Sequence, residues 1–339
     1  FRPPGFAHLW YQPAPSTPDE PNETAYATRA KLVMPSGGAN ELALNPRLSA
    51  LKARPRLLVS NSGPDNEGYH YCAKCGRIES VSAPVDNIRQ PHPLPYPNEN
   101  EPLCESIPWR GVVLGADFPT DIALFALRLE APFRLAPANS ETLSAMRTIC
   151  EALAKAACRL LEIEVGEILA EYRPALNSDT GAAGTLLEVF LYDTLAGGAG
   201  FSPQLASRGV ELFESALEIL ESCPEGCDFS CYRCLRSFRN RLDHALLDRH
   251  VGAQIIRHIL TGETPAFAQG RAVMALTLLA NELSRQLAGR FEIVRAFHAL
   301  PSAKAPLIIR RISDGSETLI DVHSPVARTL PIFGTRDLK

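Results

Sequence analysis

The sequence lacks several features that would define its class at once. No apolar run reaches the roughly eighteen residues of a membrane-spanning helix, so we expect none. The chain starts at Phe1 without Met and without the basic and apolar segments of a signal peptide, and we expect a piece of a longer polypeptide. It contains no Gly-Lys-Ser/Thr phosphate loop and no Asp-Glu-x-His box. We therefore expect a chain that is not an enzyme by itself and hydrolyses no ATP alone.

Neither charge nor polarity dominates the composition. The 339 residues carry a formal net charge of −4, with 45% hydrophobic and 21% charged residues. A chain of this kind can bury a sizeable core and is neither disordered nor strongly charged. Because the net charge is slightly acidic, binding to nucleic acid would require a local basic surface.

Nine unevenly spaced cysteines argue against the disulfide framework of a small secreted protein. Zinc thiolate sites instead use cysteines two to four residues apart, because a short turn lets both sulfurs reach one ion. The strongest cluster places four of them within twelve residues: Cys223, Cys227, Cys231 and Cys234. Four thiolates leave no free position for water, so we predict a structural Zn²⁺ in a reducing, cytoplasmic compartment. The alternatives are four buried thiols without metal, or two disulfides.

A second cluster is less complete. Cys72 and Cys75 form a Cys-x2-Cys pair followed by a glycine, a spacing typical of a zinc knuckle. Cys104 is the expected third ligand. His92, in a proline-rich segment, is the preferred fourth ligand, and His70 is the second choice because it lies only two residues from Cys72. The alternative is a cysteine pair without metal.

Prolines divide the chain into three expected parts of an α+β protein. Twenty of the 28 prolines fall in residues 1–137, which we expect to hold short strands, loops and the first zinc knuckle. Residues 138–262 are predicted to form a zinc-binding domain, and residues 263–339 a helix with short strands.

Hydrophobic periodicity predicts the main elements. The expected helices are 140–162, 203–222, 241–260 and 267–287. The expected strands are 56–60, 122–129, 163–172, 185–193, 291–296, 307–312 and 318–322. Cys150 and Cys158 lie on or beside the apolar stripe of the first helix, and we interpret them as buried core thiols.

Two other motifs could carry chemistry. The glycine-rich loop 197–200 lies between a strand and a helix and could bind phosphate, but a tight turn is the favoured interpretation. The acid pairs Glu188 with Asp193 and Asp314 with Asp321 could belong to a metal-dependent nuclease. No Lys follows them in the pattern that such a nuclease needs, so this alternative is disfavoured.

A basic segment follows the four-cysteine cluster and contains Arg233, Arg236, Arg239 and Arg241. If the segment is helical, residues three apart share one face, which suits contacts with DNA phosphates. The intervening Tyr232 and Phe238 could stack on bases or simply pack. The alternative is a solvated helix face whose charge is balanced by nearby acids.

These motifs together resemble the MrfA zinc-binding (MZB) domain family. The similarity rests on the segment from Leu191 to Gly200, a helix, and the segment from Cys223 to Asn240. The continuation from Asp243 to Arg249 is most similar to DISARM phage-defence proteins of the DrmB type. The upstream segments 71–76 and 114–121 are similar to those that precede the domain in such proteins and in YprA-like superfamily-2 helicases.

The resemblance implies a bacterial cytoplasmic protein whose zinc ligands are the four cysteines between Cys223 and Cys234. It also implies an accessory role beside a helicase, with a DrmA-like helicase subunit and DNA as partners and no catalytic residue. We expect the chain to brace the motor and to contact DNA. The alternatives are the C-terminal MZB domain of a single-chain DNA-repair helicase, a nuclease, and a purely structural adaptor between proteins.

Overall fold

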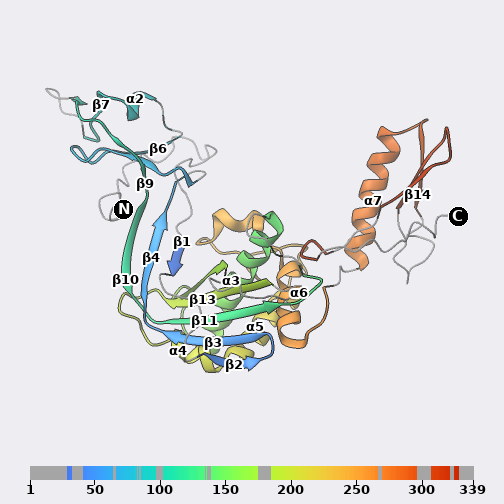
Figure 1. The fold of residues 1–339 in the computed structure, drawn as a ribbon, viewed down its shortest axis with the longest axis horizontal. Coiled ribbons are helices and arrows are strands. Elements are labelled where there is room, and N and C mark those ends of the chain that lie inside the picture. The colour runs from blue at the N-terminus through green and yellow to red at the C-terminus, as the bar shows by residue number, and fades with distance from the viewer. Residues whose placement is uncertain are drawn as a thin grey trace.

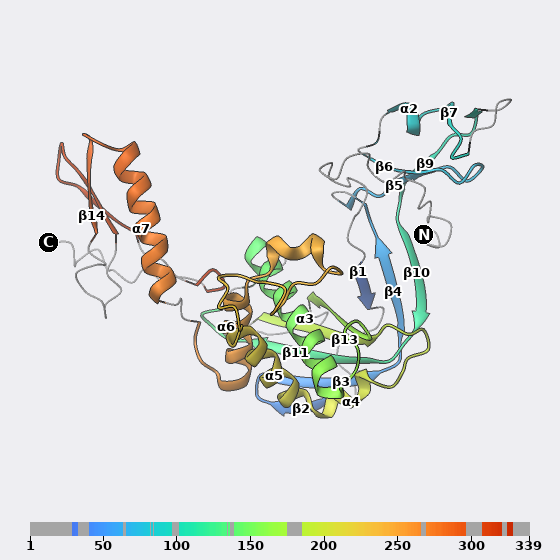
Figure 2. The same ribbon diagram turned by 180° about the vertical axis from the view of Figure 1, so that it is seen from behind.

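The protein combines helices and antiparallel sheets in three parts (Figure 1), which confirms the α+β class. A main body is connected by a β arm to a small module, and a helix with a small sheet forms the C-terminal unit (Figure 2). The computed structural model describes residues 29–32, 41–63, 66–81, 83, 85–96, 102–133, 135, 139–174, 185–265, 269–295, 307–320 and 324–327.

The main sheet is antiparallel, with the strand order β12-β13-β11-β3-β2. Its strands are β2 (Leu42–Asn45), β3 (Leu48–Ala53), β11 (Ile122–Leu129), β12 (Ile168–Pro174) and β13 (Thr185–Asp193). The central strand β11 places Phe125 beside Val189 of β13 and Ala50 of β3. Both β11 and β13 are nearly continuous apolar runs, as expected of strands that are covered on both faces.

Helices cover one face of this sheet (Figure 1). They are α3 (Ser140–Leu161), α4 (Ser202–Ser207), α5 (Gly209–Glu221) and α6 (Arg249–Thr261), with the 3-10 helix η2 (Arg241–Leu246) before α6. The apolar stripe of α3 buries Ile149 and Leu153 completely against the other helices and the sheet. In this main core, the rings of Phe125 and Phe213 meet edge to face, with centroids 5.6 Å apart.

The opposite face of the main sheet is partly covered by a second sheet of order β1-β4-β10. Its strands are β1 (Arg29–Leu32), β4 (Arg56–Asn61) and β10 (Leu114–Pro119). Leu57, Leu124 and Phe190 form a smaller buried cluster where the two sheets meet. Strands β4 and β10 form an arm that extends away from the main body (Figures 1 and 2).

The far end of the arm carries a small module, residues 69–112. It contains β5 (Tyr69–Tyr71), β6 (Ile78–Ser80), α2 (Val85–Ile88), β7 (His92–Pro93), β8 (Leu103–Cys104) and β9 (Trp109–Val112). Strands β6, β5 and β9 form one small sheet, and β7 pairs with β8. Within the described part of the chain, the buried apolar clusters include no residue of this module. Its stability must therefore come from another source.

The C-terminal unit packs α7 (Gln269–Gln286) on a sheet of order β14-β15-β16. These strands are β14 (Phe291–Arg295), β15 (Leu307–Arg311) and β16 (Glu317–Ile320). Arg271 of α7 lies 3.3 Å from Asp248 and places its guanidinium 4.9 Å from the ring centre of Phe229. These contacts attach the unit to the main body. Among the described helices, none is long and apolar enough to cross a membrane.

Sequence periodicity predicted four helices and seven strands, but it did not locate β1–β3 or β5–β10. Two of the predicted helices were wrong in their continuity. The helix expected at 203–222 is broken at Arg208, because Gly209 packs directly on the sheet. A Cβ atom at Gly209 would lie 2.4 Å from Leu44 Cδ1 and 2.8 Å from the ring of Phe125. The helix expected at 241–260 starts as the separate η2, and α6 begins only after Asp248, whose carboxylate caps it.

Two predicted boundaries also differ from the structure. The strand expected at 163–172 begins only at Ile168, because α3 ends in a left-handed residue, Glu162, followed by a turn. The boundary expected at residue 137 falls between β11 and α3, which belong to the same core. Strands from before and after this position pair within one sheet, so it does not separate two folding units.

Candidate metal centres

The four cysteines of the C-terminal zinc loop, residues 223–234, converge between α5 and η2. The Sγ atom of Cys223 lies 3.6 Å from those of Cys227 and Cys231. The Sγ atom of Cys234 lies 3.6 Å from that of Cys227 and 3.7 Å from that of Cys231. A tetrahedron with Zn–S bonds of about 2.3 Å has edges of about 3.8 Å. The four thiols are not paired as disulfides, and their arrangement fits a closed zinc site.

Two basic side chains hold the C-terminal zinc loop by its backbone. Arg249 Nε donates to the carbonyl of Cys227 at 2.7 Å, and its Nη1 donates to the carbonyl of Leu220 at the end of α5 at 2.9 Å. Lys155 of α3 donates from Nζ to the carbonyl of Cys234. Four thiolates around Zn²⁺ carry a net charge of −2, which these two cations offset. The loop is thereby fixed to three helices.

Neither of these basic residues was predicted as part of the site. Lys155 gives a weak signal, because it is the single charge in the apolar segment 152–157 of α3. Arg249 gives none, since its contacts join segments that are more than twenty positions apart in the chain.

The second group of ligands lies in the small module. Cys72, Cys75, His92 and Cys104 place one ligand atom each within 4.8 Å of all the others. The Sγ atoms of Cys72 and Cys104 are 3.8 Å apart, and Cys75 Sγ lies 3.3 Å from His92 Nε2. The short pair β7 and β8 brings two of these ligands together, because His92 and Cys104 are direct register partners. This Cys3His set also suits tetrahedral Zn²⁺.

The ring of His92 is oriented as a zinc ligand requires. Its Nδ1 lies 3.0 Å from the carbonyl oxygen of Arg89, which can only accept, so Nδ1 carries the hydrogen. The lone pair of Nε2 then points at the sulfurs. His70 lies in β5 opposite Glu79 and outside the ligand group. The structure thus brings His92 to the cysteines and leaves His70 apart.

Backbone amides favour one thiolate in each group before metal binds. Although burial opposes it, hydrogen bonds from the amides of Cys75 and Lys74 lower the pKa of Cys72 to about 6. Burial and the neighbouring Cys72 sulfur raise the pKa of Cys75 to about 12. In the C-terminal loop, amides lower the pKa of Cys223 to about 6 against burial, while burial and neighbouring sulfurs raise the pKa of Cys227. Metal binding must therefore displace protons from the other thiols.

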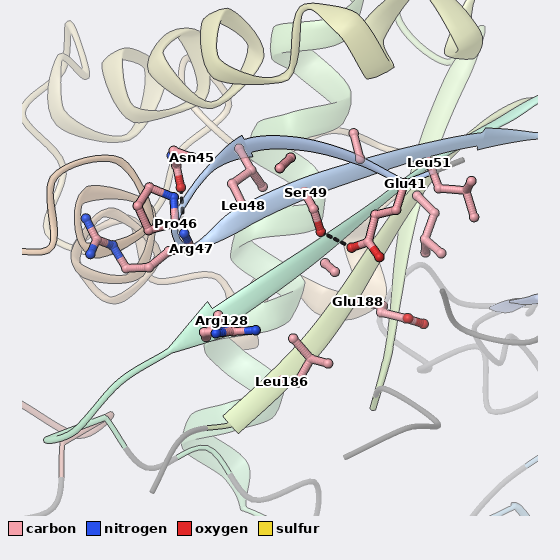
Figure 3. A pocket seen from close by; sticks show the side chains of 14 residues that line it. Glu41, Asn45, Pro46, Arg47, Leu48, Ser49, Leu51, Arg128, Leu186 and Glu188 are labelled. Carbon is pink, nitrogen blue, oxygen red and sulfur yellow. Dashed lines mark hydrogen bonds between the residues drawn. The ribbon is translucent and has the colours of Figure 1, made fainter. Parts of the chain in front are cut away.

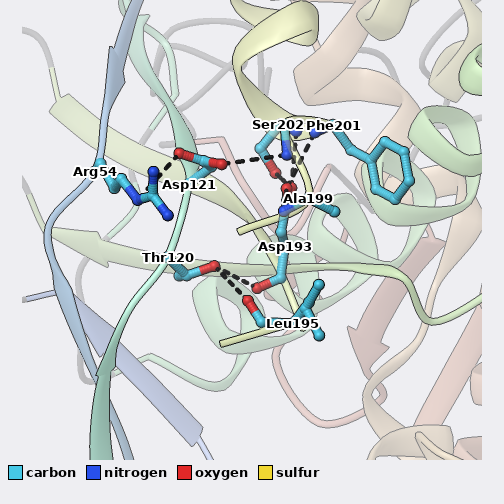
Figure 4. A network of polar contacts seen from close by, with 9 residues as sticks. Arg54, Thr120, Asp121, Asp193, Leu195, Ala199, Phe201 and Ser202 are labelled. Carbon is cyan, nitrogen blue, oxygen red and sulfur yellow. Dashed lines mark hydrogen bonds and ion pairs between the residues drawn. The ribbon is translucent and has the colours of Figure 1, made fainter. Parts of the chain in front are cut away.

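The glycine-rich loop 197–200 is filled by carboxylates of the protein itself (Figure 4). Asp193 is completely buried and accepts hydrogen bonds from the amides of Ala199, Phe201 and Ser202 at 2.8 to 3.0 Å, and from the hydroxyl of Ser202. Asp121 accepts from the amide of Gly200 and pairs with Arg54. These amides are the groups that would bind a phosphate, so the loop is a structural turn.

The acids considered for a nuclease are not assembled into a site. Glu188 is buried and pairs with Arg173 on the face of the main sheet away from the helices, whereas Asp193 binds the glycine loop. Asp314 lies in an exposed turn and binds Ser316 and Arg311, and Asp321 lies outside the described residues. Among the described residues, the groups of three or more potential metal ligands are the two cysteine-containing sets alone.

A hollow of about 620 Å³ lies on the face of the main sheet away from the helices (Figure 3). The side chains of Ser49, Leu124, Ala126, Leu186 and Glu188 form part of its floor. Two of its polar groups have partners: Ser49 donates to Glu41, and Arg173 donates to Glu188 at 2.6 Å.

Of the four arginines predicted to contact DNA, three lie in turns and loops, namely Arg233, Arg236 and Arg239, and Arg241 begins the 3-10 helix η2. Turns occupy residues 232–235 and 239–240, so the condition for a shared helix face is not met by Arg233, Arg236 and Arg239. Arg233, Arg239 and Arg241 are exposed, but Arg236 is half-buried and donates to Ser230 Oγ at 2.9 Å. Zinc coordination accounts for the conformation only up to Cys234, because four cysteines in twelve residues force that segment to wrap around one point. DNA contact by these residues remains a prediction.

Comparisons with known proteins agree with the zinc geometry. Residues 149–235 match the family model of the MrfA Zn-binding domain (MZB), which contains the C-terminal zinc loop. This match confirms Zn²⁺ as the cofactor and an MZB domain as the central part of the chain.

Over 228 residues, the chain is 33% identical to the Druantia protein DruE of Escherichia coli (strain UMEA 4076-1). The alignment covers 63% of this chain and 12% of DruE, so the chain spans only a small part of that relative. The structure can be superposed on that of the DUF1998 helicase MrfA bound to DNA with a TM-score of 0.35 and 13% sequence identity, and the match covers 66% of this chain and 25% of MrfA. Its complex with DNA and AMPPNP gives a TM-score of 0.27 and 14% identity, covering 65% and 22%.

Proposed function

We propose that this chain is a zinc-binding, non-catalytic part of a helicase-based phage-defence system. It braces the helicase motor and contributes to DNA binding. The observation that carries the proposal is the closed four-sulfur centre inside an MZB domain, in a chain that is similar to the defence protein DruE. A closed centre supplies rigidity rather than chemistry, because no coordination position is left for a substrate.

The absence of independent ATP hydrolysis is part of the proposal. It is supported by the glycine-rich loop, whose amides are bound by Asp193 and Asp121 instead of facing an open phosphate site. Steady-state ATPase assays of the zinc-loaded chain alone should show no activity above background, with or without DNA. ATP hydrolysis that co-purifies with the chain in constant proportion to the amount of protein would contradict this.

The motor can belong to either of two arrangements. The sequence resemblance to DrmB-type proteins suggests a DISARM-like accessory subunit with a separate, DrmA-like helicase in the bacterial cytoplasm. The match to a short part of the much longer DruE favours the second candidate, a motor in the same polypeptide. Purification of the tagged natural protein distinguishes the two, because the first yields a second helicase chain and the other yields one long chain.

Zinc-site variants test the common part of the proposal. We expect Cys231→Ser in the complete defence system to lower zinc content by one ion, reduce DNA-stimulated ATPase activity and abolish protection in a phage plating assay. Cys158→Ala is the matched control, because it removes a buried thiol of α3 outside both ligand groups. Full protection by the Cys231→Ser system would contradict the proposed role.

A further inference from the structure

Two aromatic rings project from the chain directly after and within the C-terminal zinc loop. Tyr232 is 65% exposed, although it directly follows the zinc ligand Cys231. Phe238 is 78% exposed. Large exposed rings give up the hydrophobic stabilisation that burial would provide. When such rings gather at one place on a soluble protein, they mark an interaction site.

The two rings belong to one continuous surface, which we name the aromatic face: Tyr232, Phe238, Arg241 and His244. The ring of Tyr232 meets the edge of the His244 ring, with centroids 5.4 Å apart. His244 Nε2 in turn lies 3.0 Å from the carbonyl of Ser237, next to Phe238. The guanidinium of Arg241 lies 4.6 Å from the ring centre of Phe238. These contacts connect the rings through short, defined steps.

The base of this face is rigid. Asn240 is buried and donates from Nδ2 to Glu151 of α3 at 2.7 Å and to the carbonyl of Leu235 at 3.0 Å. Its Oδ1 accepts from the amide of Ser237 at 2.8 Å. The zinc ligands hold the other end of the segment. A rigid face can receive a flexible ligand without an ordering cost of its own.

The charge around the rings is positive. Residues 232–246 contain four arginines and a single acid, Asp243, and that acid is buried. Arg233, Arg239 and Arg241 are exposed, although Arg233 lies 3.7 Å from Glu225 in an exposed ion pair. Such exposed pairs are weak and are readily exchanged for phosphate. The chemistry required of a ligand is therefore an anion that also carries flat, stackable groups.

We propose that the aromatic face binds single-stranded nucleic acid, with unpaired bases stacked on Tyr232 and Phe238 and phosphates beside Arg233, Arg239 and Arg241. Aromatic rings bordered by cations are the usual means of binding single strands without sequence preference. The bases of a duplex are already stacked on each other and cannot reach protruding rings. This inference rests on the proposed function, which includes DNA contact, and specifies which form of DNA is held and by which groups.

Equilibrium binding of a fluorescently labelled oligothymidylate to the zinc-loaded chain tests the inference. Tyr232→Ala and Phe238→Ala should each weaken binding about tenfold, since stacking on one ring contributes roughly 1–3 kcal/mol per base. The dependence of affinity on salt should not change, because no phosphate contact is lost. An Arg241→Gln variant should instead reduce the salt dependence, by a slope of about 0.7 for one phosphate contact.

The matched control is Phe229→Ala, which removes another exposed ring of the zinc loop that lies against Arg271 outside the aromatic face. It should bind the oligonucleotide as the unchanged protein does. Every variant must retain its zinc, measured by mass spectrometry of the metal. Unchanged binding in the Tyr232→Ala, Phe238→Ala double variant would overturn the inference, as would equal loss in Phe229→Ala or tighter binding of a duplex of the same length.

The outcome also separates this inference from the proposed function. If the double variant binds oligothymidylate normally while Cys231→Ser still abolishes phage protection, only the aromatic face is wrong. If the Cys231→Ser system protects fully while the double variant loses binding, the aromatic face stands and the bracing role is wrong.

Discussion

The two metal centres of this protein use similar donors in opposite ways. The C-terminal centre draws four ligands from one twelve-residue loop, whereas the ligands of the N-terminal centre are spread from Cys72 to Cys104. The first therefore requires only a local turn. The second requires two separate hairpins to meet, and the strand pair β7 and β8 accomplishes this by placing His92 opposite Cys104.

Their surroundings differ as well. All four cysteines of the C-terminal loop pack against the main core, and Cys234 is buried beside Leu235. The N-terminal module stands at the end of the arm and shares no residue with the described apolar clusters. Small segments without a core need another source of stability, and a bound metal is one. We therefore expect the module to fold only when zinc is bound, whereas the main body should fold without zinc and be further stabilised by it.

The largest expected effect comes from removing one ligand at each centre. Cys72→Ser should unfold residues 69–112 and leave the main thermal transition nearly unchanged, because the core does not include the module. Cys231→Ser should lower the main transition by roughly 10 °C, since a loss of several kcal/mol shifts a domain of this size by about 2–4 °C per kcal/mol. Calorimetry and hydrogen exchange of the two variants measure this.

The same experiment contains its own control. Amides of α3 and β11 should stay protected in Cys72→Ser, while amides of β5 and β9 should exchange rapidly. A single variant that unfolds both regions together would show that the arm couples the two centres, and would contradict the comparison.

The next effect tests whether the main body has anchors besides zinc. Asp193→Asn should destabilise it by about 3 kcal/mol, because a buried carboxylate that accepts four hydrogen bonds is replaced by a group with its own donors. Asp121→Asn, at the more exposed edge of the same loop, should cost only about 1 kcal/mol. Urea unfolding measures both. Equal costs would mean that burial of Asp193 adds nothing.

A smaller effect concerns the residues that hold each metal loop. Arg249→Met should accelerate zinc release to a chromogenic chelator by about 10- to 100-fold, the usual result of losing a group that orients the ligands. Arg257→Met, on the same helix but in a more exposed pair with Glu221, is the control and should release zinc at the original rate.

At the N-terminal centre, an arginine also holds the backbone beside a ligand, as Arg249 does at the C-terminal centre. Arg77 Nη1 donates to the carbonyl of Pro93, next to His92, at 3.0 Å. It makes one such contact in place of the several made by Arg249, so Arg77→Met should accelerate release less. A faster release from the Arg77 variant than from the Arg249 variant would reverse this order.

The smallest expected effect is a pH dependence of the stability of the main body, which arises beside the C-terminal zinc loop at Glu151. Burial raises the pKa of Glu151, and the bond from Asn240 and the charge of Arg147 only partly oppose this. The folded state therefore holds the Glu151 proton more tightly than the unfolded state, and stability rises as the pH falls through the folded pKa. Below the unfolded pKa, near 4.5, the contribution no longer changes.

Glu151→Gln should remove this dependence and keep an acceptor for Asn240. At neutral pH, we expect the variant to be more stable than the unchanged protein by up to about 1 kcal/mol. At mildly acidic pH, this difference should disappear. Urea unfolding at two pH values measures it. A wild-type protein whose stability rises from acidic to neutral pH as steeply as that of the variant would contradict the assignment to Glu151.

Local patterns predicted the long helices and seven of the strands, but not β1–β3 or β5–β10. The strand at 122–129 and the strand at 185–193 were located to the residue, because continuous apolar runs flanked by turns admit few alternatives. The helix expected at 140–162 ends one residue earlier. The break at Arg208 was missed, because the close approach of Gly209 to Leu44 and Phe125 depends on distant strands. The start of α6 carries a local signal, because Asp248 is a favoured capping residue.

The sequence by itself determined the C-terminal zinc ligands, because four sulfurs within twelve residues can reach one ion whatever the rest of the chain does. Only the tertiary structure decided that His92 completes the other set, that Asp193 fills the glycine loop, and that Arg249 and Lys155 hold the zinc loop. The contacts of His92, Arg249 and Lys155 join segments that are far apart in the chain, and the direction of the Asp193 carboxylate within its own local turn depends on the strands around it. It is the packing of sheets and helices that brings them within bonding distance.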